Sequence, residues 1–299
     1  MIPLPPGFLR GAYTPLITPF KSGAVDHASF AALIEFQIAQ GSDGLVVATA
    51  TGEPFSLSLA ERRALLETAV TVTRERVPIV AATGGVSLAE TLALTEHASD
   101  AGADAVLVLP PPFTKPPQRG VLEYFLAVAR AANVPLLAYQ IPSRTGCTIS
   151  LDTCEAMVNA MPHLVGLKQA EEDRDFVRQA LDRFGADFRA FMGGPVIAWE
   201  MLAEGASGLM LTVGNVVPRE VADLCRFAAA GQGADARALQ QAIGPLNQAT
   251  LLETNPIGVK YIAARMGLIA TAEVRLPLAP PEPALAAMLD AALASAGLL

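Results

Sequence analysis

The chain has 299 residues, of which 52% are hydrophobic and 17% are charged, so it can form one large domain with a sizeable core, or two small ones. Its formal net charge of −8 argues against binding of nucleic acid, which requires a basic surface. We expect no membrane span and no signal peptide, because Gly, Pro or charged residues interrupt every apolar run and MIPLPPGFLRG has no basic start followed by an apolar stretch.

Short runs rich in Val, Leu and Ile alternate with longer segments of helical periodicity. The runs predict eight strands, at residues 11–18, 44–49, 79–82, 105–109, 136–139, 164–168, 188–192 and 207–212. The segments between and after them predict helices at residues 27–39, 59–73, 88–101, 120–131, 151–161, 173–184, 195–203 and 219–230.

Three helix-to-strand junctions resemble one another: QGSDGLVV (40–47), AGADAVLV (101–108) and EGASGLML (204–211). Each has a glycine at the helix end, where a left-handed backbone costs this residue little. A repeated βα unit with continuously apolar strands indicates a parallel sheet covered on both faces. We therefore predict a (β/α)8 TIM barrel at residues 1–231. A doubly wound open sheet is the alternative, weakened by the lack of GxGxxG after the first strand.

After residue 231 the pattern predicts helices only, at residues 235–249, 257–266 and 283–296. Asp235 suits the start of the first helix, because its carboxylate can cap free backbone N–H groups. Residues 232–299 are therefore predicted to be a C-terminal helical extension.

The cysteines and histidines give no sign of a metal site. Cys147, Cys154 and Cys225 are odd in number and lack CxxC spacing, and the three histidines form no HxH or HxxxH pattern. We therefore expect no metal, no cofactor and a cytoplasmic location in a reducing environment.

In a barrel of this kind the active site lies at the C-terminal ends of the strands. LVGLKQ (164–169) places Lys168 at the end of the sixth strand, among apolar neighbours. Desolvation there lowers the pKa of the amine from about 10.4, and a neutral amine can form a Schiff base with a ketone. Alternatively, the lysine extends its ammonium to a carboxylate such as Glu53 or Glu171.

Other polar residues end neighbouring strands. Tyr139 can exchange protons beside the lysine, or it is a core tyrosine. Thr51 and Gly52, in TATGE (49–53), can hold a carboxylate, or they lead into a helix whose capping box is formed by Ser58 and Glu61. Arg144 can bind a second carboxylate, or it is a solvated loop residue.

Two glycine-rich stretches, MGGP (192–195) and TVGN (212–215), end the last two strands. They are typical of phosphate-binding loops in barrels, but no Lys or Arg stands beside either. Alternatively, the glycines of these stretches leave room for the substrate because they have no side chain.

Four ordered motifs resemble the dihydrodipicolinate synthase / N-acetylneuraminate lyase family: TGE after the second strand, YxxPSRTG after the fifth, GLK on the sixth, and NPIGVK near the C-terminus. The resemblance runs from about residue 11 to the end of the chain. It implies a (β/α)8 barrel with a helical extension that assembles as a homotetramer or homodimer. It also implies a lysine that forms a Schiff base with pyruvate or another 2-oxo acid.

Carried over to this chain, the resemblance makes Lys168 the Schiff-base lysine and Tyr139 its proton-transfer partner. Thr51 would bind the carboxylate of the 2-oxo acid, and Arg144 would meet the carboxylate of an aldehyde substrate. The remaining positions expected to bind substrate are Ala50, Gly52, Phe113, Gly193 and Met210.

The chain departs from the synthase branch of this family. Ala50 stands where the synthase has a threonine, and Phe113 where it has an interface tyrosine, so two hydroxyls of its proton relay are missing. Gln169 follows the lysine where relatives often have an acid. Pro54, Phe55 and Val86 replace residues of its lysine-inhibition site, so we predict no feedback inhibition by lysine.

The main hypothesis is a class I aldolase or lyase that makes or cleaves a carbon–carbon bond between pyruvate, or a related 2-oxo acid, and a polar aldehyde. The alternatives are dihydrodipicolinate synthase itself, which condenses pyruvate with aspartate semialdehyde, a dehydratase of 2-keto-3-deoxy sugar acids, and a non-catalytic 2-oxo acid binding protein.

Overall fold

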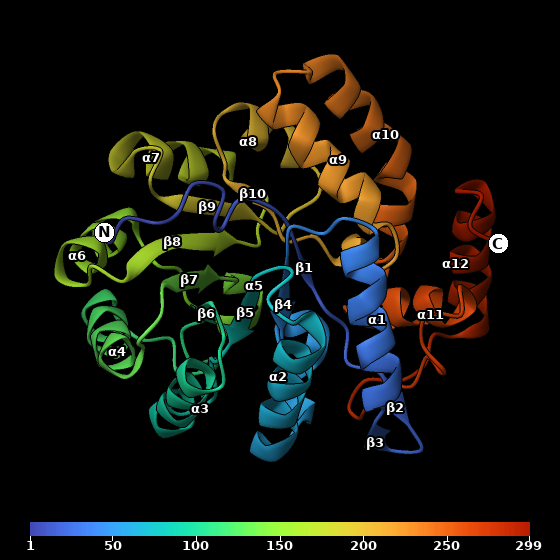
Figure 1. Cartoon of the computed structure of the whole chain (residues 1–299), viewed down its shortest axis with the longest axis horizontal. Helices are drawn as coiled ribbons and strands as arrows, with labels where there is room; N and C mark the ends of the chain where they lie inside the picture. Colours follow the sequence, from blue (N-terminus) through green and yellow to red (C-terminus); the bar gives the residue numbers. More distant parts are fainter.

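The computed structural model describes all 299 residues and contains a closed barrel of eight parallel strands, in the order β1-β10-β9-β8-β7-β6-β5-β4 (Figure 1). The strands are β1 Gly11–Pro15, β4 Gly44–Val47, β5 Ile79–Ala82, β6 Ala105–Val108, β7 Leu136–Gln140, β8 Leu164–Gln169, β9 Arg189–Met192 and β10 Gly208–Leu209. The predicted (β/α)8 barrel is therefore confirmed.

Helices follow the strands and surround the barrel (Figure 1). They are α1 His27–Ala39, α2 Leu59–Thr73, α3 Leu88–Asp100, α4 Gln118–Ala131, α5 Pro142–Thr145, α6 Leu151–Ala160, α7 Arg174–Phe184, α8 Ala198–Ala203 and α9 Pro218–Ala229. The junction glycines Gly41, Gly102 and Gly205 have φ values of 90°, 91° and 107°, as their places at helix ends predicted.

The strands separate two apolar layers, one inside the barrel and one under the helices. On β6, Ala105 and Leu107 belong to the inner layer, whereas Val106 and Val108 belong to the outer one. This alternation follows from the two-residue period of side chains along a strand. The inner layer fills the barrel, so a polar side chain in it must find partners or remain desolvated.

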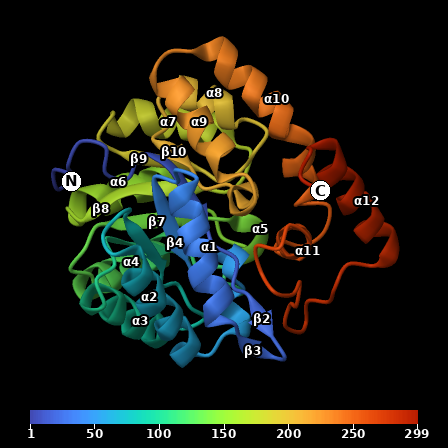
Figure 2. The same cartoon turned by 45° about the vertical axis from the view of Figure 1, so that its right-hand side comes forward.

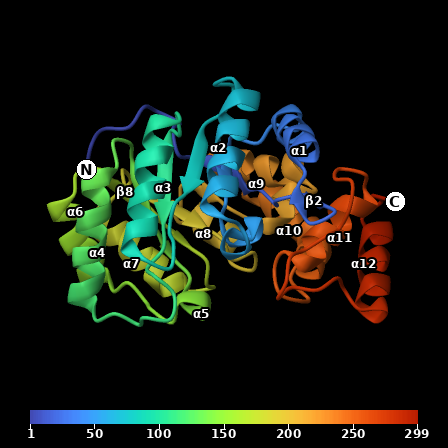
Figure 3. The ribbon, with the colours of Figure 1, turned by 90° about the horizontal axis from the view of Figure 1, so that it is seen from below.

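Three helices follow the barrel: α10 Gly233–Ala249, α11 Ile257–Arg265 and α12 Pro283–Ser295. Helix α10 contacts α8 and α9, and α12 contacts α10 and α11. Figures 2 and 3 show α11 beside the barrel, on the side of α1 and the hairpin of β2 (Phe20–Lys21) and β3 (Ala24–Val25), with α12 on the outer side of α11. No helix of the chain combines the length and the apolar character that crossing a membrane requires.

Some boundaries differ from those predicted. Strand β10 ends at Leu209, and a 3₁₀ turn follows at Thr212–Asn215, so the last strand is shorter than residues 207–212. Helix α8 begins at Ala198 instead of residue 195. Just before it, the carboxylate of Glu172 accepts the N–H groups of Val196 and Ile197, which satisfies two donors that a helix start leaves free.

The start of α10 also differs from its prediction. Asp235 does not cap the helix: the N-cap residue is Gln232, without a side-chain bond, and Asp235 lies in the first turn. There its negative charge still interacts favourably with the positive end of the helix dipole. The predicted capping box is confirmed at α2, where Ser58 and Glu61 exchange bonds with each other's backbone N–H groups.

Candidate active site

An irregularity in β8 decides where its lysine points. The residues of β8 pair with β7 one to one, except that Val165 has no partner. Val165 lies in the inner apolar layer and Leu167 in the outer one, whereas regular alternation would put both on one face. The unpaired residue therefore turns Lys168 into the barrel. Only glycine fits at Gly166, since a Cβ there would lie 2.0 Å from the carbonyl oxygen of Arg189.

Lys168 lies inside the barrel beside Tyr139, its register partner on β7. Its Nζ donates to the Tyr139 hydroxyl at 3.4 Å and lies 4.4 Å from the centre of the tyrosine ring. Burial lowers the pKa of Lys168 to about 7 and raises that of Tyr139, so the hydroxyl keeps its proton. Gly193 leaves room for the lysine, because a Cβ at Gly193 would lie 3.0 Å from Lys168 Cε.

A second buried lysine shows what is unusual about Lys168. Lys260 is fully buried, but its Nζ donates to the Glu53 carboxylate at 2.7 Å and lies 4.1 Å from the centre of the Phe20 ring. Burial lowers its pKa too, whereas the Glu53 carboxylate opposes that shift. Lys168 has no carboxylate partner. A desolvated amine without an acid is available as a nucleophile near neutral pH.

The TATGE loop, residues 49–53, follows β4 and is buried. Ala50–Gly52 form a 3₁₀ turn. The Gly52 N–H donates to the Thr49 carbonyl at 2.8 Å, and Thr18 Oγ1 donates to the Gly52 carbonyl at 2.8 Å. The Thr51 hydroxyl accepts the side-chain N–H of Asn255 at 3.0 Å and retains its own proton to donate. Thr51 is therefore held from outside the barrel, and the Gly52 N–H is already engaged.

Arg144 lies on the short helix α5 and is exposed. One guanidinium nitrogen donates to the Asn255 carbonyl at 3.3 Å, and no carboxylate pairs with it. Asn255 thus touches both Thr51 and Arg144. An unpaired guanidinium can bind a carboxylate through two parallel bonds.

A narrow cavity lies at the C-terminal end of the barrel. Ala50, Tyr139 and Arg144 line it, together with Ala48, Thr49, Pro54, Phe55, Ala82, Gly84, Leu109, Pro112, Ile141 and Thr145. Most of this lining is apolar, with one cation and a few hydroxyls. Such a site suits a small substrate that is fixed by a few polar contacts.

Of the predicted site residues, only Ala50, Tyr139 and Arg144 line this cavity. The other six do not: Lys168, Thr51, Gly52, Phe113, Gly193 and Met210. Phe113 is 90% exposed in the single chain, and its neighbour Pro112 lines the cavity instead. Met210 is buried in the inner layer of the barrel with Tyr139. The structure thus brings Lys168, Tyr139, Ala50 and Arg144 to one end of the barrel, with Thr51 and Gly193 beside them.

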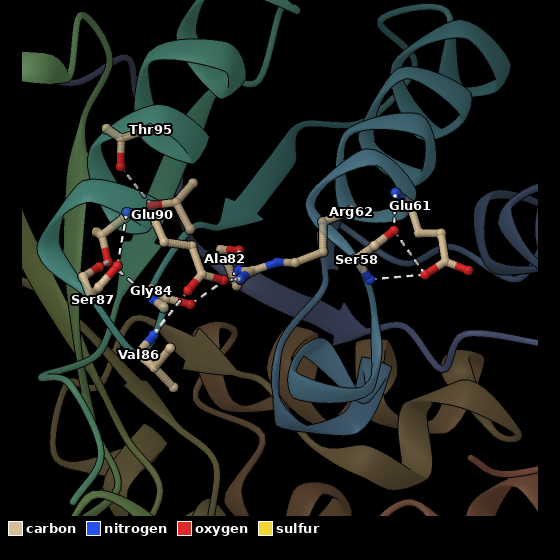
Figure 4. A network of polar contacts seen from close by, with 12 residues as sticks. Ser58, Glu61, Arg62, Ala82, Gly84, Val86, Ser87, Glu90 and Thr95 are labelled. Carbon is tan, nitrogen blue, oxygen red and sulfur yellow. Dashed lines mark hydrogen bonds and ion pairs between the residues drawn. The ribbon is translucent and has the colours of Figure 1, made fainter. Parts of the chain in front are cut away.

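The wall formed by the β5–α3 loop depends on a buried arginine, as Figure 4 shows. Arg62 of α2 donates to the carbonyls of Ala82 and Gly84 at 2.9 and 3.0 Å, and its guanidinium lies 3.4 Å from the Glu90 carboxylate. Glu90 also accepts the N–H of Val86 at 3.3 Å. Burial lowers the pKa of Arg62 to about 10. Since Ala82 and Gly84 line the cavity, Arg62 helps to fix its shape.

Sequence reasoning did not single out Thr49, Asn255 or Arg62. Thr49 lines the cavity with a buried hydroxyl that has no partner in the protein. Its position in the TATGE stretch, directly after a predicted strand, is the signal that could have identified it. Asn255 lies in the quoted NPIGVK motif, but no rule of spacing brings that motif to a loop 204 residues earlier. Arg62 follows the capping box and gives no signal of its own in the sequence.

A family model described as the dihydrodipicolinate synthetase family matches residues 8–296. The chain belongs to this family. The 4-hydroxy-tetrahydrodipicolinate synthase of Nitratidesulfovibrio vulgaris (strain DP4) is 39% identical over 289 residues, which cover 97% of this chain and 99% of the relative. That of Persephonella marina (strain DSM 14350 / EX-H1) is 38% identical over 269 residues, which cover 90% and 92%.

Solved structures of the family agree with this fold. Dihydrodipicolinate synthase from Aquifex aeolicus superposes with a TM-score of 0.94 at 36% identity, covering 97% of this chain and 98% of the other. The chloride-inhibited synthase from Acinetobacter baumannii complexed with pyruvate has a TM-score of 0.94 at 34% identity and covers 97% and 100%. Membership of the dihydrodipicolinate synthetase family makes this chain an enzyme, a lyase of the aldolase type that acts through a Schiff base with pyruvate.

Proposed function

We propose that this enzyme joins pyruvate, bound covalently to Lys168, to a short aldehyde that carries a carboxylate. The observation that carries the proposal is the buried amine of Lys168, which has a hydroxyl 3.4 Å away and no acid partner. Aspartate semialdehyde is the first acceptor to test, because it is the aldehyde that the resemblance to dihydrodipicolinate synthase implies, and the relatives are named as such synthases.

The amine of Lys168 attacks the C2 carbonyl of pyruvate, and loss of water from the carbinolamine gives the iminium. Tyr139 protonates the departing hydroxyl and regains a proton later, as a general acid and base. The iminium withdraws electrons, so a C3 proton leaves and an enamine forms. The enamine carbon then attacks the aldehyde, and water releases the product from the lysine.

Binding is assigned to groups beside the lysine. The Thr51 hydroxyl donates to the pyruvate carboxylate, and Arg144 receives the carboxylate of the aldehyde at the cavity mouth. Ala50 and Phe113 supply no hydroxyl for a proton relay, so Tyr139 works with water or with the unpartnered hydroxyl of Thr49. The largely apolar lining provides few partners for a polyhydroxylated sugar acid, which disfavours a dehydratase.

Borohydride trapping tests the proposal. The protein is mixed with pyruvate, reduced with sodium borohydride and mapped by mass spectrometry. We expect an adduct on Lys168, none on the equally buried Lys260, and none at all in Lys168→Ala. An adduct on Lys260, or none with pyruvate, would contradict the assignment. An adduct formed only with a longer 2-oxo sugar acid would favour a dehydratase.

The acceptor is tested by comparing aspartate semialdehyde with aldehydes of similar length that lack the carboxylate. We expect turnover only with the carboxylate-bearing aldehyde. In Arg144→Ala its KM should rise by about tenfold or more, while the KM for pyruvate stays unchanged. Equal turnover of both kinds of aldehyde would refute the role of Arg144.

We further propose that the enzyme works as a homotetramer or homodimer in the cytoplasm. Phe113, Leu276 and Val196 are large apolar side chains that are mostly exposed in the single chain, and contact with another copy would cover them. The three cysteines are buried and unpaired, as in a reducing compartment. Light scattering on the purified protein measures the assembly, and a monomeric mass would reject it.

A further inference from the structure

The C-terminal extension holds the TATGE loop through a buried ion pair. Lys260 of α11 and Glu53 lie 2.7 Å apart, with side chains 0% and 1% exposed. The backbone N–H of Arg275 donates to the second carboxylate oxygen of Glu53 at 3.1 Å. Both oxygens of Glu53 are therefore bound by residues more than 200 positions later in the chain.

An aromatic ring completes this contact. Phe20 of β2 is fully buried, with Lys260 Nζ 4.1 Å and Arg275 Cζ 4.4 Å from its ring centre. The guanidinium of Arg275 also donates to Glu61 at 2.6 and 2.9 Å and to the Ser56 carbonyl at 2.9 Å. Arg275 therefore contacts the chain on both sides of α2's start, directly after the TATGE loop.

The backbone of the loop needs such an anchor. Glu53 has φ 54° and ψ 47°, a left-handed backbone conformation that residues other than glycine rarely adopt. Its N–H donates to the Ala50 carbonyl at 3.3 Å and closes the turn that carries Thr51. Asn255, five residues before Lys260, donates to the Thr51 hydroxyl at 3.0 Å. One segment of the extension thus contacts Thr51 directly and fixes the residue that ends its turn.

We propose that Glu53 and Lys260 are positioning residues, whose buried ion pair holds the turn that presents the Thr51 hydroxyl to the carboxylate of pyruvate. The role of Thr51 rests on the function proposed above. Removing one partner leaves a buried charge without compensation, whereas removing both leaves a neutral pair of similar shape.

The test compares four variants: Lys260→Met, Glu53→Gln, the double variant, and Arg76→Met as a control. Arg76 and Glu35 also form an ion pair at 2.7 Å, but with side chains 40% and 51% exposed and away from the loop. Each variant is assayed for kcat and for the KM of pyruvate. Hydrogen exchange of peptides that cover residues 49–57 and 136–141 is measured in parallel.

We expect the two single variants to raise the KM for pyruvate by about tenfold or more, with a smaller loss of kcat, because a displaced Thr51 weakens binding more than it affects the lysine. The double variant should recover most of the affinity, and Arg76→Met should match the native enzyme. Exchange should increase at residues 49–57 in the single variants and stay unchanged at residues 136–141.

An unchanged KM in both single variants, or a double variant no better than either of them, would overturn the proposal. If Lys260→Met does not fold, Asn255→Ala removes only the bond to Thr51 and should raise the KM for pyruvate about threefold to tenfold. An unchanged KM there would equally count against it. If the native enzyme forms no pyruvate adduct on Lys168, the proposed function fails, and the exchange of residues 49–57 still decides whether the pair holds the loop.

Discussion

Replacing Lys168 by methionine should stabilise the protein at neutral pH while abolishing activity. The pKa of Lys168 is lowered from 10.5 to about 7 because the ammonium is desolvated inside the barrel. The shift corresponds to about 5 kcal/mol of unfolding free energy, the cost of burying this amine in its charged form. Methionine fills similar space without the charge. Below pH 7, the free energy of unfolding of Lys168→Met should therefore exceed that of the native enzyme by up to about 5 kcal/mol.

The gain should depend on pH with a definite sign. Between about pH 7 and 10.5 the unfolded chain binds one more proton at this lysine than the folded chain does, so the native enzyme becomes more stable as the pH rises. The advantage of Lys168→Met should therefore shrink by about 1.4 kcal/mol per pH unit across this window. From pH 7.5 to 9.0 this amounts to about 2 kcal/mol.

Urea unfolding of both proteins at pH 6.0, 7.5 and 9.0, at one protein concentration, measures the difference. Lys21→Met, at an exposed position, controls for the loss of one positive charge. An advantage of Lys168→Met that is the same at all three pH values would refute a lowered pKa for Lys168. The nucleophilicity of the Lys168 amine would then need an explanation other than desolvation.

Three further results are expected. Tyr139→Phe should still form the pyruvate adduct on Lys168, but about 100-fold more slowly in a quenched-flow assay, because it loses the proton-transferring hydroxyl; an unchanged rate would exclude that role. Gly166→Ala should lower the free energy of unfolding by about 3 kcal/mol in urea, since the new Cβ would collide with a backbone carbonyl; native stability would show that β8 can shift. Millimolar lysine should not inhibit turnover, because Pro54, Phe55 and Val86 stand where the family resemblance places residues of a lysine-inhibition site; tight, cooperative inhibition would overturn this prediction.

The alternation of apolar strands and helices was sufficient to predict the barrel, because the pattern repeats over most of the chain and each βα unit is local. The same pattern placed Lys168 and Tyr139 at strand ends. It could not predict which way Lys168 points. LVGLKQ has the pattern of a regular strand. The direction of the Lys168 side chain depends on the irregularity at Val165, and this irregularity is seen only in the structure, where Val165 has no partner on β7.

Contacts between distant segments were also beyond the sequence. In the sequence, Lys260 stands out only as part of NPIGVK, and Glu53 is predicted as a possible partner of Lys168, whereas the structure pairs it with Lys260. Nothing in either motif specifies the other, because their pairing depends on how the extension returns to the barrel. Hence only the structure reveals the contacts of Asn255 and Arg62 and the Glu53–Lys260 ion pair.

The dependence of the TATGE loop on the extension also sets the order in which the site is completed during synthesis. Glu53 leaves the ribosome 207 residues before Lys260, an interval of about 10 to 40 s at ordinary translation rates. During that interval a nascent barrel could already contain Lys168, while Glu53 and the Thr51 hydroxyl would lack the bonds from the extension. The TATGE loop therefore receives its bonds from the extension only when almost the whole chain has been made.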